Sequence, residues 1–356
     1  MTAPLAVPST TFAAPDDRTA TEPAEHRGLD RDQVRLLVAS PAGITHTTFR
    51  RLPDQLNRGD LLVVNTSGTL PAELDGRWRG GRPVVVHLAT DLRDGTWVAE
   101  LRSAPDAAAP ILDAASDDLV RLPGRVRLRL VAPYPRPHSS PTGTGNRLWR
   151  VRIGGTGSVV NYLYRHGRPI AYGYLRGRFP LADYQTMFAA DPGSAEMPSA
   201  GRPFTRQLVN RLLAAGVRIA PITLHTGVSS QDAGEAPQSE WFTVAASTAE
   251  LVNSTRRSAG RVIAVGTTVT RALESAVTTD GTLAARTGWT SLVVEPCRGV
   301  RVVDGLITGW HNPEASHLLL VEAVAGAALT QQAYDAAFAE RYLWHEFGDA
   351  GLLLAR

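Results

Sequence analysis

Two histidines are the residues of this chain best placed to do proton chemistry. His225 follows the apolar stretch 217–224, and His311 follows Trp310 after the apolar stretch 306–308. An imidazole titrates near neutral pH, so a histidine held in a pocket can act as an acid or a base. We therefore expect His225 and His311 to be catalytic. A histidine in such a position can also be a packing residue, and for His225 both interpretations stay open.

A Gly-Thr-Thr turn supplies a second group of candidates. It joins a predicted buried strand, 262–265, to a predicted helix. Gly266 lets a ligand approach the backbone, and either threonine after it can cap the helix, whose first N–H groups favour a polar or anionic ligand. Arg271 and Glu274 lie three residues apart on that helix. Because they share a face of the helix, both are candidates to bind a ligand; the alternative is an ordinary strand–helix junction with a surface ion pair.

The neighbouring elements would bring these groups together. Thr205 is a good N-cap for an amphipathic helix over 207–215, and the strand that follows ends just before His225. The strand before His311 leads to a helix that Pro313 can start. Open α/β sheets bind ligands at the carboxyl ends of their parallel strands. We therefore expect the candidates to share one cleft.

The segment from about residue 74 to 153 has a different texture, with short strands of alternating polarity. Leu128 and Leu130 alternate with Arg127 and Arg129, as in a half-buried strand. The arginines could form a basic face for a phosphate backbone, or only a solvated sheet face. Ahead of this segment, residues 33–49 predict a β-hairpin.

Composition restricts the chemistry further. All 37 basic residues of the 356-residue chain are arginines, which excludes lysine Schiff bases and a P-loop lysine. Cys297 is the single cysteine and is expected to be a packed thiol, and no metal-ligand spacing occurs, so no metal is expected. The first 28 residues lack a signal pattern, and no apolar run is long enough to cross a bilayer. We expect a cytoplasmic enzyme that has no membrane partner.

These segments together resemble the S-adenosylmethionine:tRNA ribosyltransferase-isomerase family of queuosine synthesis. The resemblance extends over nearly the whole chain, through GDLLVVN (59–65), DYQTMFAADPGS (183–194), SEWFTV (239–244) and RYLWHEFGDAGLLL (341–354). It implies an α/β fold, with a barrel-like core interrupted by a small inserted β-barrel. The implied division is a flexible arm over 1–28, a core over 29–73 and 154–356, and the inserted barrel over 74–153.

The resemblance also implies a reaction. S-adenosylmethionine serves as co-substrate and ribosyl donor, the acceptor is a 7-aminomethyl-7-deazaguanine base in tRNA, and adenine and methionine leave as epoxyqueuosine forms. The tyrosines that could stack on adenine or on a splayed base, or else lie in the core, are Tyr162, Tyr164, Tyr172 and Tyr174. The expected substrate-binding residues are Asn65, Ser199, Gly201, Gly227, Glu240, Gly266, Thr267, Thr268, Arg271, Glu274 and Trp310.

The chain departs from the family pattern within its best-matching blocks. Gly68 and Glu73 stand where the family has arginines, Pro203 stands where it has a histidine, and the loop 228–238 is short. A carboxylate at Glu73 that faced RNA phosphate would repel it, which predicts weak affinity for tRNA. Two alternatives therefore remain beside the family reaction. One is a paralogue that uses S-adenosylmethionine on a small-molecule acceptor, or cleaves or cyclises it; the other is a non-catalytic binder of nucleosides or RNA.

Overall fold

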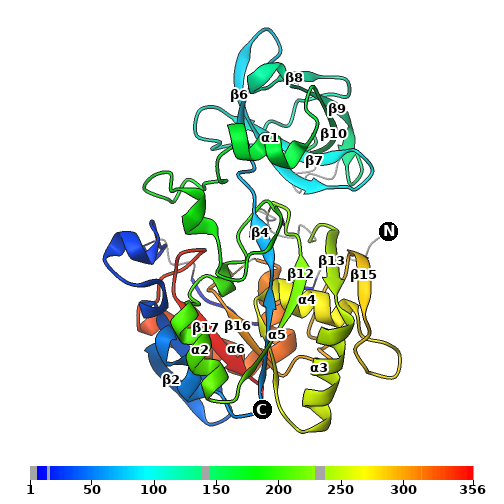
Figure 1. Ribbon diagram of the computed structural model, residues 1–356. Coiled ribbons are helices and arrows are strands. Elements are labelled where there is room, and N and C mark those ends of the chain that lie inside the picture. Colours follow the sequence, from blue (N-terminus) through cyan, green and yellow to red (C-terminus); the bar gives the residue numbers. More distant parts are fainter. Residues whose placement is uncertain (1–5, 14–16, 138–144, 229–236, 314, 356) are drawn as a thin grey trace.

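The computed structural model describes residues 6–13, 17–137, 145–228, 237–313 and 315–355. A nine-stranded mixed sheet forms the core, and a closed six-stranded barrel stands at one end of it (Figure 1). The core sheet is open, with edge strands β15 and β2. In spatial order its strands are β15 (Arg286–Thr290), β13 (Glu240–Val244), β12 (Arg218–Leu224), β3 (Leu61–Asn65), β14 (Val262–Val265), β16 (Gly305–Thr308), β17 (Ala350–Leu354), β1 (Arg35–Ser40) and β2 (Gly43–Thr48).

Four neighbouring strands of this sheet, β12, β3, β14 and β16, run parallel. Every residue of β3, β14 and β16 is buried, because helices cover both faces. Leu61 and Val63 pack against one helical layer and Leu62 and Val64 against the other, as strand alternation requires. One layer contains α3 (Ala246–Arg257), α4 (Thr267–Ser275), α5 (His317–Ala325) and α6 (Ala327–Ala339), and the other contains α2 (Arg206–Ala214).

The barrel begins where β3 leaves the carboxyl edge of the core sheet. Figure 1 shows the chain rising through β4 (Ser67–Thr69) into the barrel. Leu128 and Leu130 point into the barrel's own apolar core while Arg127 and Arg129 are exposed, as their alternation predicts. In order of pairing the barrel strands are β10 (Leu148–Gly154), β7 (Trp97–Ser103), β6 (Arg82–Asp91), β5 (Glu73–Trp78), β8 (Leu119–Arg121) and β9 (Arg127–Tyr134). The predicted fold class, an α/β core with an inserted β-barrel, is confirmed.

Local predictions succeed where neighbouring residues decide the outcome. β1 and β2 form the predicted hairpin, and the Thr205 hydroxyl accepts a hydrogen bond from the Leu208 N–H at 3.1 Å to cap α2. The predicted threonine cap of α4 is wrong. Gly266 itself is the N-cap, with φ of 102°, and no side chain caps the helix. The helix expected from Pro313 begins later, at His317.

The described part of the N-terminal arm lies against the core. The Thr10 hydroxyl and N–H both donate to Glu322 of α5, at 2.7 and 2.6 Å, and Thr19 forms a bridge with Trp344. None of the helices in the described ranges could span a membrane. The remaining elements are α1 (Val159–His166), β11 (Asp191–Ser194) and the short 3-10 turns η1 (Ala24–Arg27), η2 (Arg31–Gln33), η3 (Phe49–Gln55), η4 (Pro123–Arg125), η5 (Leu181–Tyr184) and η6 (Ser199–Gly201).

Candidate active site

A cavity of about 770 Å³ lies where the carboxyl ends of the parallel strands face the barrel. The loops that follow β12, β14 and β16 line one side, and His87 and Arg102 of the barrel line another. The topology makes this site: strands β12, β14 and β16 are far apart in sequence but end at the same sheet edge.

Most of the predicted site residues meet in this cavity. Those that line it are Ser199, Gly227, Glu240, Gly266, Thr267, Thr268, Arg271, Trp310 and His311. Those that lie outside its lining are Asn65, Gly201, His225 and Glu274. The cleft expected at the strand ends is therefore present, and it is lined by most but not all of the predicted residues.

Arg271 and Glu240 form a buried ion pair on one wall. The Arg271 Nη1 donates to Glu240, whose other oxygen accepts the Gly227 N–H at 3.4 Å. The rest of the guanidinium donates to the carbonyls of Leu292 at 2.8 Å, Gln238 at 2.7 Å and Thr290 at 3.2 Å. Four of the five N–H groups are thus committed to protein acceptors. Arg271 fixes the position of Glu240 and leaves only one N–H for a ligand.

His311 and Trp310 occupy the loop after β16. The His311 ring stacks on the ring of His317, with centroids 4.8 Å apart, and its Nε2 lies 3.0 Å from the Thr308 hydroxyl. Burial lowers the pKa of His311 well below its usual range, and His317 and His345 add to this effect. His311 is therefore neutral at pH 7, and its catalytic role stays a prediction. Trp310 packs edge-on against Tyr334 in the core.

The histidine expected to be the second catalytic residue lies just behind the cavity. The His225 Nδ1 is 2.8 Å from the Ser67 hydroxyl, and its Nε2 is 3.6 Å from the carboxylate of Asp191. A Cβ on Gly193 would lie 2.4 Å from that Nδ1, so the ring fills the space that this glycine leaves. Burial lowers the pKa of His225, and the charge of Asp191 opposes the decrease. Its catalytic role stays a prediction.

The other predicted residues outside the cavity have structural partners. Asn65 joins β3 to β12, since its amide donates to the Leu224 carbonyl at 2.9 Å and accepts the Leu224 N–H at 3.0 Å. Glu274 accepts the N–H groups of Arg301 and Val302, at 2.8 and 3.0 Å, and so holds the loop before β16. Glu274 and Arg271 share a helix but bind different segments. Gly201 lies in η6, against Thr186.

One wall of the cavity contains residues that sequence patterns indicate only in part. Tyr172 and Tyr174 stack with centroids 5.9 Å apart, and Tyr174 stacks on His345 at 4.6 Å. The two tyrosines were candidates for stacking, whereas nothing in the sequence singles out His345, Glu346 or Glu196. Tyr162 packs instead in the barrel core, and Tyr164 is exposed.

The chain is similar to known proteins over nearly its whole length. A family model described as queuosine biosynthesis protein matches residues 7–353. The chain belongs to this family. It is 34% identical over 96% of its length to the S-adenosylmethionine:tRNA ribosyltransferase-isomerase of Desulfitobacterium hafniense, of which 98% is covered. It is 35% identical over 96% of its length to the enzyme of the same name from Thermus thermophilus, again with 98% of that protein covered.

A solved structure agrees with the family membership. The crystal structure of S-adenosylmethionine tRNA ribosyltransferase from Thermotoga maritima matches with a TM-score of 0.53 and 25% identity, covering 96% of this chain and 99% of that one. The resemblance inferred from the separated sequence blocks is confirmed.

The position at which the chain has Glu73 in place of the expected arginine lies inside the protein and not on its surface. Glu73 is fully buried at the base of the barrel, where it pairs with His87 at 3.0 Å, Arg168 at 2.7 Å and Arg178 at 2.5 Å. Burial alone would raise the pKa of Glu73, but these three partners lower it to about 2. The expectation that Glu73 faces and repels RNA is therefore wrong, because an arginine network encloses it.

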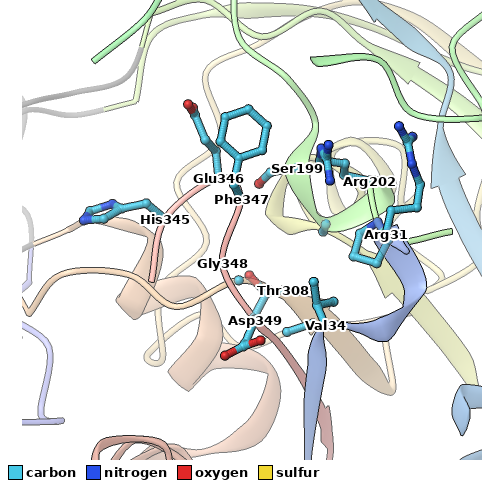
Figure 2. Close-up of a pocket in the computed structure, with 14 residues that line it drawn as sticks. Arg31, Val34, Ser199, Arg202, Thr308, His345, Glu346, Phe347, Gly348 and Asp349 are labelled. Atoms are coloured by element: carbon cyan, nitrogen blue, oxygen red, sulfur yellow. The ribbon is translucent and has the colours of Figure 1, made fainter. Parts of the chain in front are cut away.

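The other two substituted positions also lie inside the protein. Gly68 is buried in β4, with Pro192 next to it, and Pro203 is buried beside the small cavity shown in Figure 2. Most of the shortened loop, residues 229–236, lies outside the described residues.

Proposed function

We propose that the protein is an S-adenosylmethionine:tRNA ribosyltransferase-isomerase that acts on a 7-aminomethyl-7-deazaguanine base in tRNA to form epoxyqueuosine. The observation that carries this proposal is the match over 96% of the chain to relatives that bear this name. A tRNA substrate favours the cytoplasm as the place of action. The division into a core over 29–73 and 154–356 and an inserted barrel over 74–153 is part of the same proposal.

The cavity supports the proposal by its size and its chemistry. A volume of about 770 Å³ lies within the range of about 300–1,000 Å³ common for ligand pockets. The Glu240 carboxylate, held by Arg271, suits the ammonium group of S-adenosylmethionine. The aromatic part of the lining, with Tyr172, Tyr174 and His345, suits a flat purine.

The barrel surface supports an RNA acceptor. Arg77 on β5 is directly opposite Arg121 on β8, which is directly opposite Arg127 on β9; Arg129 on β9 is opposite Arg152 on β10. All five side chains are exposed. Like charges in directly opposed positions destabilise a sheet, so this row opposes folding unless a polyanion neutralises it.

These arginines have few protein partners. Arg129 pairs with Asp117 at 2.6 Å, but the others of the row form no ion pair within the described ranges. Arginine is well suited to phosphate because its guanidinium can donate two parallel hydrogen bonds. We therefore propose that the row contacts the tRNA backbone, which is the functional one of the two interpretations of the alternating strands.

A single set of incubations tests the proposal. Purified protein is given S-adenosylmethionine with precursor-bearing tRNA, with unmodified tRNA, or with no RNA, and adenine, methionine and the mass of the tRNA base are followed. The proposal expects adenine and methionine to appear together with a mass increase of the base, only when precursor tRNA is present. Release of adenine and methionine without RNA would indicate a small-molecule or acceptor-free reaction. No turnover together with donor or RNA binding would indicate a binding protein.

A further inference from the structure

Glu346 has a carboxyl oxygen that lacks a partner among the described residues. It lies on the segment before β17 and lines both the large cavity and a small one of about 20 Å³ next to it. Figure 2 shows Glu346 beside Phe347, at the end of this segment away from Asp349. The Oε1 atom of Glu346 is buried and accepts no hydrogen bond from any described residue. A buried polar atom without a partner is costly, so a bound ligand that supplies one is favoured.

The surroundings of Glu346 hold a proton on it. Burial, together with the charge of Glu196, raises its pKa to about 8, and the charge of Arg202 only partly opposes this. The other titratable groups that face it are the hydroxyls of Tyr174 and Tyr184, whose pKa values burial raises, so both are neutral at pH 7. Glu196 itself accepts a hydrogen bond from Tyr172. Glu346 is therefore a neutral acid at pH 7.

The other titratable groups of the cavity are poor proton donors at that pH. Burial lowers the pKa of His311, His317 and His345, so these rings are neutral. Burial raises the pKa of Glu240, but both of its oxygens already have partners, Arg271 and the Gly227 N–H. An arginine does not give up its proton in this range. Glu346 thus combines a spare proton with direct access to the cavity.

The reaction needs such a donor. S-adenosylmethionine carries adenine on the sugar, so transfer of the ribosyl group must break the bond between the sugar C1′ and an adenine nitrogen. The bonding electron pair goes to adenine, which leaves more easily if a proton reaches one of its ring nitrogens. The rings of Tyr172, Tyr174 and His345, on the wall that includes Glu346, provide a surface on which adenine can stack.

We propose that Glu346 is the general acid that protonates the departing adenine, with the base stacked on the Tyr172–Tyr174–His345 wall. The inference rests on the proposed function. In the step, the C1′–N bond breaks with its electron pair going to adenine, and the proton moves from the Glu346 carboxyl to an adenine ring nitrogen. The ring oxygen of the sugar stabilises the positive charge left at C1′, and Glu346 becomes a carboxylate that solvent reprotonates after product release. The proton that neutralises adenine is the one that the carboxyl holds at pH 7.

The test compares Glu346→Gln with the wild type from pH 6 to 9.5. In the wild type, kcat for adenine release falls as pH rises through about 8, since Glu346 loses its proton. In Glu346→Gln, we expect kcat to be about 10²–10⁴-fold lower at pH 7, the usual contribution of a general acid, and the alkaline decrease to disappear. Glu196→Gln removes the neighbouring charge, so its alkaline decrease should move to lower pH. Glu250→Gln, on the exposed side of α3, is the matched control and should keep the wild-type profile.

A binding measurement keeps the inference separate from the proposed function. Calorimetric titration with adenine alone should show affinity that weakens above pH 8 in the wild type and is independent of pH in Glu346→Gln. If the wild type releases no adenine from S-adenosylmethionine with precursor tRNA, the proposed function fails, and the general-acid role fails with it even if adenine binding follows this pattern. If the wild type turns over but Glu346→Gln keeps its rate and its alkaline decrease, the assignment of the acid is overturned while the function stands.

Discussion

Replacement of Glu73 by glutamine tests how the barrel is fastened to the core. The carboxylate has an ordinary pKa of 4.5, which its partners lower to about 2. At about 1.4 kcal/mol per pKa unit, this difference corresponds to about 3 kcal/mol of stability. That value agrees with the cost of about 3–5 kcal/mol for breaking a buried ion pair. The variant Glu73→Gln should therefore lose about 3 kcal/mol at pH 7.

The direction of the pKa change determines how the contribution of Glu73 to stability depends on pH. A carboxylate whose pKa is lowered on folding contributes its full stability above pH 4.5, and the contribution declines as pH falls from 4.5 toward 2. The deficit of Glu73→Gln should therefore shrink from about 3 kcal/mol at pH 7 to about 2 kcal/mol at pH 3.5. Urea unfolding followed by circular dichroism and tryptophan fluorescence at both pH values measures this. Trp78 and Trp149 lie in the barrel core and report on its unfolding.

Two outcomes would refute this reasoning. An unchanged urea midpoint at pH 7 would mean that the Glu73 network contributes no net stability. A gain in tRNA affinity on neutralising Glu73 would mean that the carboxylate does face RNA. Glu250→Gln, which changes an exposed carboxylate of the same kind, should alter neither quantity.

Three further substitutions test the site and the barrel surface. Arg271→Ala should cost about 3–5 kcal/mol of stability, because it leaves Glu240 as a buried unpaired charge. In thermal denaturation, the further change Glu240→Gln should recover part of this loss. Additive effects of the two changes would mean that Arg271 and Glu240 do not stabilise each other. Arg127→Glu should weaken binding to tRNA of any sequence and reduce the slope of log Kd against log salt by the equivalent of at least about one phosphate contact. Arg257→Glu on α3 should have neither effect. Equal effects of the two variants in fluorescence titrations would mean that the row of arginines on the barrel does not bind RNA. His225→Ala should reduce kcat by about 10²–10⁴-fold, as expected for the loss of a general base. A reduction of about tenfold or less, the worth of its one hydrogen bond to Ser67, would refute this role.

The sequence predicts those features that depend on short stretches of chain. The apolar runs of β3 and β14, the alternation in β9 and the Thr205 cap all follow from the identities of a few adjacent residues. The convergence of Gly227, Gly266 and Trp310 is also predictable, because parallel strands place their carboxyl ends at one edge. The cap of α4 is not predictable in this way, since the N-cap is Gly266, with φ of 102°, one residue before Thr267 and two before Thr268.

The rest of the site depends on long-range pairing that no local pattern encodes. Glu346 reaches the cavity because β17 inserts between β16 and β1, antiparallel to one and parallel to the other. Glu73 is a buried, ion-paired carboxylate and not an exposed charge that repels RNA. The reason is that the segment after the barrel brings Arg168 and Arg178 to it.

These ion pairs with the segment after the barrel explain why a glutamate at position 73 is compatible with the family fold. At Glu73 the chain has a negative charge surrounded by arginines from this segment, so the ion pairs are made within the protein and not with RNA. The basic character available to RNA is instead on the outer face of the barrel, where Arg121 and Arg127 are opposed and exposed. Substitution in a matching block therefore carries little information about the acceptor until its burial is known. The acceptor is better judged from the exposed row, whose like charges favour a polyanion.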